Sequence, residues 1–173
     1  IVTSGICPAI TSGTVTVTVN DLFTSGAIEA TGETICFGDN PGLIGNVTLA
    51  SGGSNVITYS WRSDADGYTA AIGGATSSDY TPPPGLAATT TYRRYAKDGS
   101  CNIIPTASAN DWTVTINQPS IAPSSISGTT PICNGTTIIL TAVGGTLGTG
   151  ANYQWGTGNT VGSSPLSGET AST

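Results

Sequence analysis

Residues 14–20 read TVTVTVN and alternate apolar and polar side chains with the period of a β-strand. Val15, Val17 and Val19 share one face and the threonines share the other, which is the pattern of a half-buried antiparallel strand. Residues 112–117 (WTVTIN) repeat this word further along the chain. The two copies predict an all-β protein in which one kind of strand occurs more than once.

Cysteines and tryptophans recur at nearly one offset: 101 − 7 = 94 for Cys7 and Cys101, 155 − 61 = 94 for Trp61 and Trp155, and 133 − 36 = 97 for Cys36 and Cys133. A period of this length is typical of tandem immunoglobulin-like antiparallel β-sandwich modules. We therefore expect residues 1–20 to be the closing strand of a preceding module, 26–117 a complete module and 121–173 the first part of a following one. The proline-marked joint between the last two should hold them extended.

Runs rich in Val, Ile, Thr and Tyr alternate with clusters of Gly, Pro, Asn and Ser within the complete module. They predict strands at 34–36, 45–50, 58–62, 79–81, 89–97 and 111–117. Trp61 falls in a middle strand, where a large ring fills much of a core only two sheets thick. We expect it at the centre of the core.

Composition limits the function classes. Charged residues make up 8% of the chain, against about 25% in a typical domain, and the net charge is −6 with four Lys or Arg residues. Such a chain lacks the clustered cations that bind nucleic acid or an anionic membrane. It also lacks a run of about 18 apolar residues, so we expect no membrane insertion. It opens at Ile1 without a signal peptide, so we expect a processed start.

The chain has no histidine, which removes imidazole-based nucleophile activation and general-base catalysis. The four cysteines lack the close C-x-x-C spacing of structural zinc sites. We therefore expect no enzyme activity and no cofactor. The cysteines instead suggest one structural disulfide per module, formed in an oxidising compartment.

Two short clusters are candidate sites. Asp64 and Asp66 lie in a D-x-D-G word that resembles half a calcium loop, but a polar turn after the Trp61 strand is the favoured interpretation. The run Tyr92, Arg93, Arg94, Tyr95 is a candidate contact patch for a partner or polysaccharide. The favoured alternative is a strand on which arginine stems lie over tyrosine rings.

Four longer words carry a family resemblance: YSW at 59–61, IGGATSSDYTPP at 72–83, TTTYRRYA at 89–96 and GSC at 99–101. Together they resemble the immunoglobulin-like or PKD-like tandem repeats of giant Bacteroidetes cell-surface proteins, of the gliding-motility adhesin type exported by type IX secretion. The resemblance implies an extracellular, cell-surface location. It also implies a disulfide between Cys36 and Cys101, with Cys7 and Cys133 pairing outside the chain.

Two functions follow as hypotheses. The first is a structural or adhesive stalk, spacer or filament, whose partners are neighbouring repeats of the same protein and other copies in a fibre. The partial modules are then completed within one chain or by a strand from another copy. The second is a carbohydrate-binding accessory module of a secreted enzyme, with surface polysaccharide as the partner. Aromatic residues make up only 6% of the chain, which favours the first hypothesis.

Overall fold

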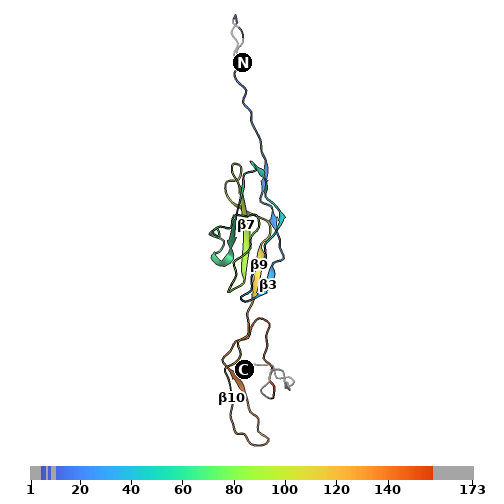
Figure 1. The fold of residues 1–173 in the computed structure, drawn as a ribbon, viewed down its shortest axis with the longest axis vertical. Coiled ribbons are helices and arrows are strands. Elements are labelled where there is room, and N and C mark those ends of the chain that lie inside the picture. Colours follow the sequence, from blue (N-terminus) through green and yellow to red (C-terminus); the bar gives the residue numbers. More distant parts are fainter. Residues whose placement is uncertain (1–4, 7, 9–10, 158–173) are drawn as a thin grey trace.

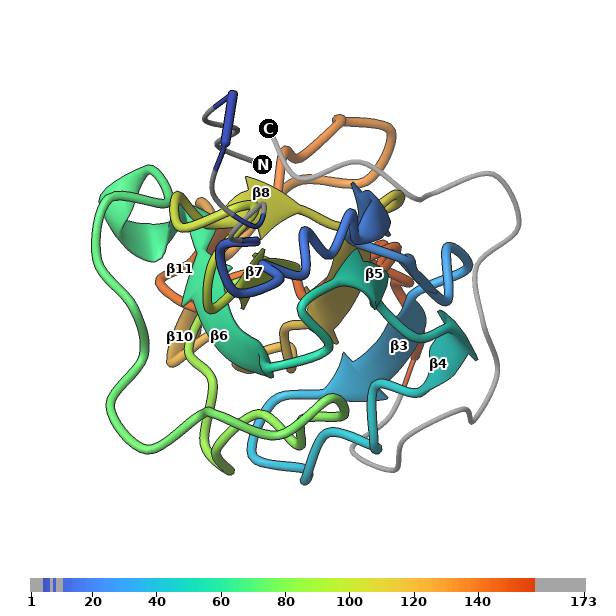
Figure 2. The ribbon, with the colours of Figure 1, turned by 90° about the horizontal axis from the view of Figure 1, so that it is seen from above.

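The computed structural model describes residues 5–6, 8 and 11–157 of the chain. Residues 21–117 form a two-layered β-structure, drawn in the middle of Figure 1 and seen end-on in Figure 2. An extended tail reaches one end of this module, and a thinner third segment leaves from the other end (Figure 1). We refer to residues 11–20 as the tail and to residues 21–117 as the module.

The larger sheet has five strands. Its order is β3-β9-β7-β6, with β8 paired to β7, and the bounds are β3 Glu33–Cys36, β6 Ile57–Ser63, β7 Thr90–Asp98, β8 Thr106–Ala107 and β9 Trp112–Asn117. All of its pairs are antiparallel except β3 with β9, which is parallel. The third strand of the module, β3, therefore lies beside its last strand, β9.

The second layer is made of short strands: β1 Asp21–Thr24 pairs with β5 Ser51–Gly53, and β2 Ala27–Ile28 pairs with β4 Asn46–Thr48. Both pairs are antiparallel. An antiparallel bridge between Ile44 and Tyr80 extends this layer on its other side. A short 3₁₀ helix, η1 (Asp64–Asp66), follows β6.

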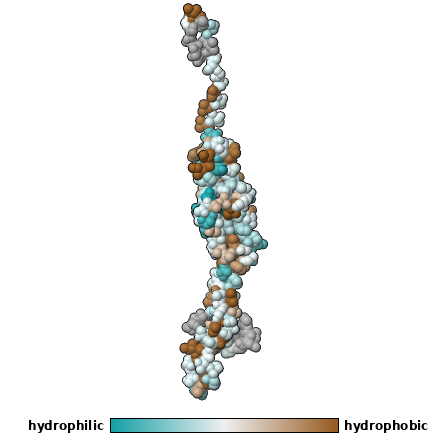
Figure 3. Space-filling view, turned by 90° about the vertical axis from the view of Figure 1, so that its left-hand side faces the viewer, coloured by the Kyte–Doolittle hydropathy of each residue, from teal (hydrophilic) through white to brown (hydrophobic). Residues whose placement is uncertain are grey.

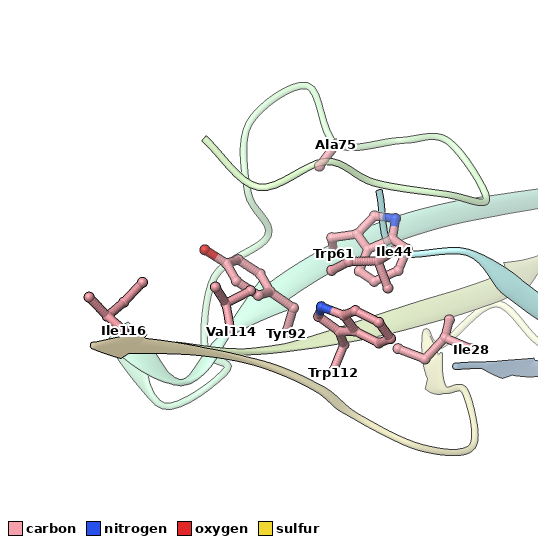
Figure 4. Packing of buried hydrophobic residues seen from close by; sticks show 8 residues of the cluster. All are labelled: Ile28, Ile44, Trp61, Ala75, Tyr92, Trp112, Val114 and Ile116. Atoms are coloured by element: carbon pink, nitrogen blue, oxygen red, sulfur yellow. The ribbon is translucent and has the colours of Figure 1, made fainter. Parts of the chain in front are cut away.

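The core lies between the two layers, around Trp61. Alternate residues of β9 are buried, as the period of a strand requires. The buried cluster comprises Ile28, Ile44, Trp61, Ala75, Tyr92, Trp112, Val114 and Ile116 (Figure 4). The Trp61 ring stacks on that of Tyr80 at 5.4 Å between centroids, and its Nε1 donates to the Ser77 carbonyl at 2.9 Å. The expectation that Trp61 is central to the core is confirmed.

Two of the expected strands differ in the structure. The run 45–50 is shortened to β4, and a separate short strand, β5, begins at Ser51. Gly52 and Gly53 of β5 have positive φ angles of 80° and 63°, which favour glycine. The expected strand at 79–81 is reduced to the bridge at Tyr80. Three consecutive prolines, at 82–84, follow it, and proline has no N–H to continue a ladder.

The folded module also begins earlier than the predicted boundary at residue 26. Residues 21–25 include β1, which pairs with β5.

The two flanking segments are simpler. No strand assignment falls on the tail within the described residues. In the third segment β10 (Ser125–Ser127) pairs antiparallel with β11 (Thr141–Val143). Of the predicted end units, residues 1–4, 7, 9–10 and 158–173 lie outside the described part of the chain. Among the described residues, no helix is long and apolar enough to cross a membrane.

Candidate functional site

The YRRY run on β7 divides between the two faces of the sheet. Tyr92 and Arg94 point inward and are 3% and 0% exposed. Arg93 and Tyr95 lie on the outer face and are partly exposed. The predicted contact patch of all four residues is therefore wrong, because strand alternation places two of them in the interior.

Arg94 is a charged side chain enclosed by neutral hydrogen-bond acceptors. Its Nε donates to the Ser108 hydroxyl at 2.8 Å, and its two terminal nitrogens donate to the Asn46 side-chain oxygen and to the carbonyls of Ser78, Thr48 and Ser25. These five bonds equal the number of guanidinium N–H groups, so the donors of Arg94 are satisfied without a carboxylate. Burial lowers the pKa of Arg94. The residue ties β7 to separate segments of the second layer.

The outer face of β7 carries a ladder of arginines and tyrosines. Arg93 forms a bidentate bond to the Asp111 carboxylate, at 2.7 Å from Nε and 2.5 Å from Nη2. The bonds from Asp111 raise the pKa of Arg93. The Arg93 guanidinium lies 4.3 Å from the ring centroid of Tyr68, and that of Arg62 lies 4.5 Å from the ring of Tyr95. Arginine heads therefore lie over tyrosine rings on this face, but the ring that Arg93 covers, Tyr68, lies outside the YRRY run, and Tyr95 is covered by Arg62.

The two aspartates of the predicted calcium candidate serve the turn after β6. Asp64 Oδ1 accepts from the Thr91 N–H at 2.9 Å, which fixes η1 against β7. The Asp66 carboxylate accepts from the N–H groups of Thr69 and Ala70. These bonds, led by that of Ala70, lower the pKa of Asp66. Within the described residues, no group of three or more metal-binding side chains surrounds them.

Cys36 and Cys101 lie at opposite ends of the larger sheet. Cys36 ends β3 beside Asn117, whereas Cys101 follows the far end of β7. Glu33 of β3 and Thr90 of β7 are both level with Val114, and the two strands run in opposite directions from there. The nine residues of β7 alone span about 26 Å.

A disulfide needs Cα atoms no more than about 7 Å apart, so the predicted Cys36–Cys101 bridge is wrong. Both thiols, and that of Cys133, are free and exposed in the structure. The physical reason is the parallel pairing of β3 with β9, which carries Cys36 away from the end of β7. Cys7 lies outside the described residues.

A buried carboxylate sets the position of Cys101. Asp98 accepts from the Ser54 hydroxyl and from the N–H groups of Cys101 and Ser100, at 2.8, 2.8 and 3.0 Å. The bonds from Ser54, Cys101 and Ser100 hold the pKa of Asp98 well below its usual range. From the tail, Asn20 Nδ2 donates to the Cys101 sulfur at 3.4 Å. Sequence reasoning missed Asp98, since nothing local marks it as the organiser of this turn.

The end of the module that carries Cys101 also exposes apolar side chains. Leu22 lies at this end because it follows Asp21, which pairs with Gly53. Gly53 in turn packs closely against Asp98, since a Cβ added at Gly53 would lie 2.5 Å from the Asp98 carboxylate. We call this region the Cys101 end, and its exposed apolar residues are Leu22, Val56, Ile103 and Ile104, at 89%, 62%, 67% and 75% exposure. Figure 3 shows apolar side chains gathered where the tail joins the module. Such a cluster on one end favours an interaction surface.

The topology defines the class of protein. A sheet with neighbouring strands β9, β7 and β6, a buried Trp on β6 and a parallel β3–β9 pair is that of an immunoglobulin-like β-sandwich. The chain belongs to the family described as "Domain of unknown function (DUF8696)", whose model matches residues 24–118. No curated protein and no solved structure matches the chain.

Proposed function

We propose that this chain is a segment of an extracellular tandem array of immunoglobulin-like modules, acting as a stalk or spacer with adhesion as an added role. The observation that carries the proposal is an alternating sequence pattern that occurs twice in the chain, buried in one copy and exposed in the other. In β9, Trp112, Val114 and Ile116 are 7%, 0% and 6% exposed. The tail repeats the word, and there Val15, Val17 and Val19 are 88%, 83% and 89% exposed.

An extended, unpaired segment with three exposed valines has no source of stability of its own. In the module, β9 is stabilised by β3 on one side and β7 on the other. The same pattern in the tail is therefore best explained by equivalent neighbours that belong to another module. Those neighbours come either from the same chain or from a second copy.

The arrangement of the segments supports a linear array. The tail and the third segment meet the module at opposite ends of its long axis (Figure 1). At the second junction, Gln118 Nε2 donates to the Ala87 carbonyl of the module at 3.0 Å. Apolar residues at the Cys101 end provide a surface for a preceding module to cover.

The carbohydrate-binding alternative has less support. A sugar platform needs exposed aromatic faces, whereas Trp61, Trp112 and Tyr92 are buried. The rings of Tyr68 and Tyr95 are covered by arginines. The carboxylates of Asp64 and Asp66 accept backbone N–H bonds, and that of Asp111 pairs with Arg93. Because these carboxylates serve structural contacts, the role that we propose is non-catalytic.

Electron microscopy of the intact protein, isolated from its source cells, tests the proposal. We expect thin rods whose length rises by at least about 2.6 nm per repeat, the span of the nine-residue strand β7. Compact particles with no axial repeat would contradict it. Glycan-array binding that is lost on Tyr68→Ala and Tyr95→Ala would favour the carbohydrate-binding alternative.

A further inference from the structure

We propose that consecutive modules are joined by a disulfide between the cysteine that ends β3 in one module and the cysteine that follows β7 in the next. The inference rests on the proposed tandem array. It assigns a role to two exposed thiols that the fold places about a module's length apart. Cys36 would bond forward to the following module, and Cys101 would bond back to the preceding one.

The first step is the position of Cys36 within its own module. Cys36 is level with Asn117 in the parallel pair of β3 and β9. Paired residues in a ladder direct their side chains to the same face of the sheet, and neighbouring strands lie about 5 Å apart. Asn117 therefore marks where the thiol of Cys36 lies at the exit end of the module.

The second step uses the position of the tail to infer where the β3 cysteine of the preceding module would lie. Asn20 ends the tail word as Asn117 ends β9, and 117 − 20 = 97 equals the offset of 133 − 36 = 97 between Cys36 and Cys133. A strand equivalent to β3 beside the tail would thus place its terminal cysteine next to Asn20. Asn20 Nδ2 already lies 3.4 Å from the Cys101 sulfur. The two thiols would then be neighbours.

The third step is that Cys101 is prepared for such a bond. Its N–H is held by the buried Asp98 carboxylate at 2.8 Å, and its side chain is exposed. A fixed backbone lowers the conformational entropy lost when the disulfide closes. The exposed residues Leu22, Ile103 and Ile104 surround the same end and would be covered by the neighbouring module.

The chemistry is an ordinary dithiol oxidation. The two thiols lose two protons and two electrons and form one S–S bond. The electrons pass to the disulfide of a thiol–disulfide exchange protein, which leaves as a dithiol, by thiolate attack through a mixed disulfide. An oxidising compartment, as expected for an extracellular protein, supplies this partner.

Peptide mapping of the intact protein, isolated with its free thiols blocked, is the direct test. We expect the peptide that contains Cys36 to be linked to a cysteine peptide from the following repeat that matches residues 98–102. Blocked, unlinked Cys36 and Cys101 would overturn the inference, and so would a bond between these two residues within one module. If microscopy shows rods while the thiols are blocked, the disulfide fails but the array stands. If no rods are seen, the array itself fails.

A second test uses this chain alone. With Cys7, Cys36 and Cys133 changed to Ser, Asn20→Cys should form a disulfide with Cys101 in a glutathione redox buffer. Thr18→Cys is the matched control, because it lies two residues back on the same face of the tail. We expect the Asn20→Cys bond to form at least about tenfold faster, since contact raises the effective concentration. Equal rates for the two variants, or no bond to Cys101, would contradict the docking of the tail on which the inference depends.

Discussion

At the scale of single residues, the buried guanidinium of Arg94 is the contact on which the two layers depend. Arginine suits the position because its planar fork carries five donors, whereas lysine carries three on a single nitrogen. The acceptors come from positions far apart in the chain, at Ser25, Asn46, Thr48, Ser78 and Ser108. Removing the donor leaves several buried acceptors unsatisfied at once.

Arg94→Lys should lower the free energy of unfolding by about 3 kcal/mol, because unsatisfied buried groups cost about 1–3 kcal/mol each. Urea unfolding followed by tryptophan fluorescence measures this, since Trp61 and Trp112 are buried. Arg93→Lys is the matched control on the same strand. Its ion pair with Asp111 is about one-third exposed on each side, so we expect a loss below about 1 kcal/mol. Equal losses in the two variants would contradict the role of Arg94.

Asp98 gives a pH-dependent prediction. Its carboxyl pKa is lowered in the folded state by bonds from Ser54, Cys101 and Ser100. A lowered pKa stabilises the fold above the unfolded-state value of 3.8, and this stabilisation is lost as the pH falls below it. Asp98→Asn should therefore lower the urea midpoint at pH 7, and the difference from the wild type should shrink as the pH falls below about 4.

The measurement is a series of urea unfolding curves between pH 7 and pH 2. Asp21→Asn is the control, because it removes an exposed carboxylate at the same end of the module. It should leave the midpoint at pH 7 close to that of the wild type. A difference for Asp98→Asn that stays constant across the series would show that the carboxylate charge is not what matters.

At the scale of elements, the repeated strand word allows one substitution to be made in two environments. Val114 is buried in β9, between β3 and β7, while Val17 holds the same place in the tail and is 83% exposed. The side chains are identical, so the difference is one of packing. Sequence periodicity alone assigns both to a half-buried strand.

Val114→Ala should cost about 2 kcal/mol of module stability, from two lost methyl groups and the cavity that they leave. Val17→Ala should change stability by less than about 0.5 kcal/mol in this chain. Urea unfolding of both variants makes the comparison. A large loss for Val17→Ala would mean that the tail packs on the module in solution.

At the scale of the whole molecule, the module should fold by itself. All eight residues of the buried cluster lie between Ile28 and Ile116. Every acceptor of Arg94 also lies within the module. The tail and the third segment therefore add little to its core.

A shortened chain of residues 21–118 should unfold cooperatively at a urea midpoint close to that of the full chain. A chain of residues 26–118 should be less stable by about 2 kcal/mol or more, because it lacks β1 and the Ser25 carbonyl that accepts from Arg94 and Ser108. Calorimetry or urea unfolding of the two chains decides this. Equal stability would show that residues 21–25 are not part of the folded unit.

Local pattern in the sequence was enough to predict the all-β class, the central place of Trp61 and the strands β3, β6, β7 and β9. Those features depend on alternation and turn residues, which act over a few positions. The candidate site was predicted less well. The YRRY run was expected to form one contact patch, and only the packed structure decides that Tyr92 and Arg94 point inward. The acceptors of Arg94 come from distant segments, which no local pattern reveals.

The cysteines show the same division between local and long-range information. Their spacing indicates a repeat, and that inference needs no fold. Their partners depend on which strands lie side by side, and the parallel pairing of β3 with β9 is a long-range choice that no short word encodes. The alternating pattern at residues 14–20 was determined by the sequence itself. That its valines lie exposed, while the apolar residues Trp112, Val114 and Ile116 of β9 lie buried, was decided only by tertiary structure, because burial requires neighbouring strands and a facing layer.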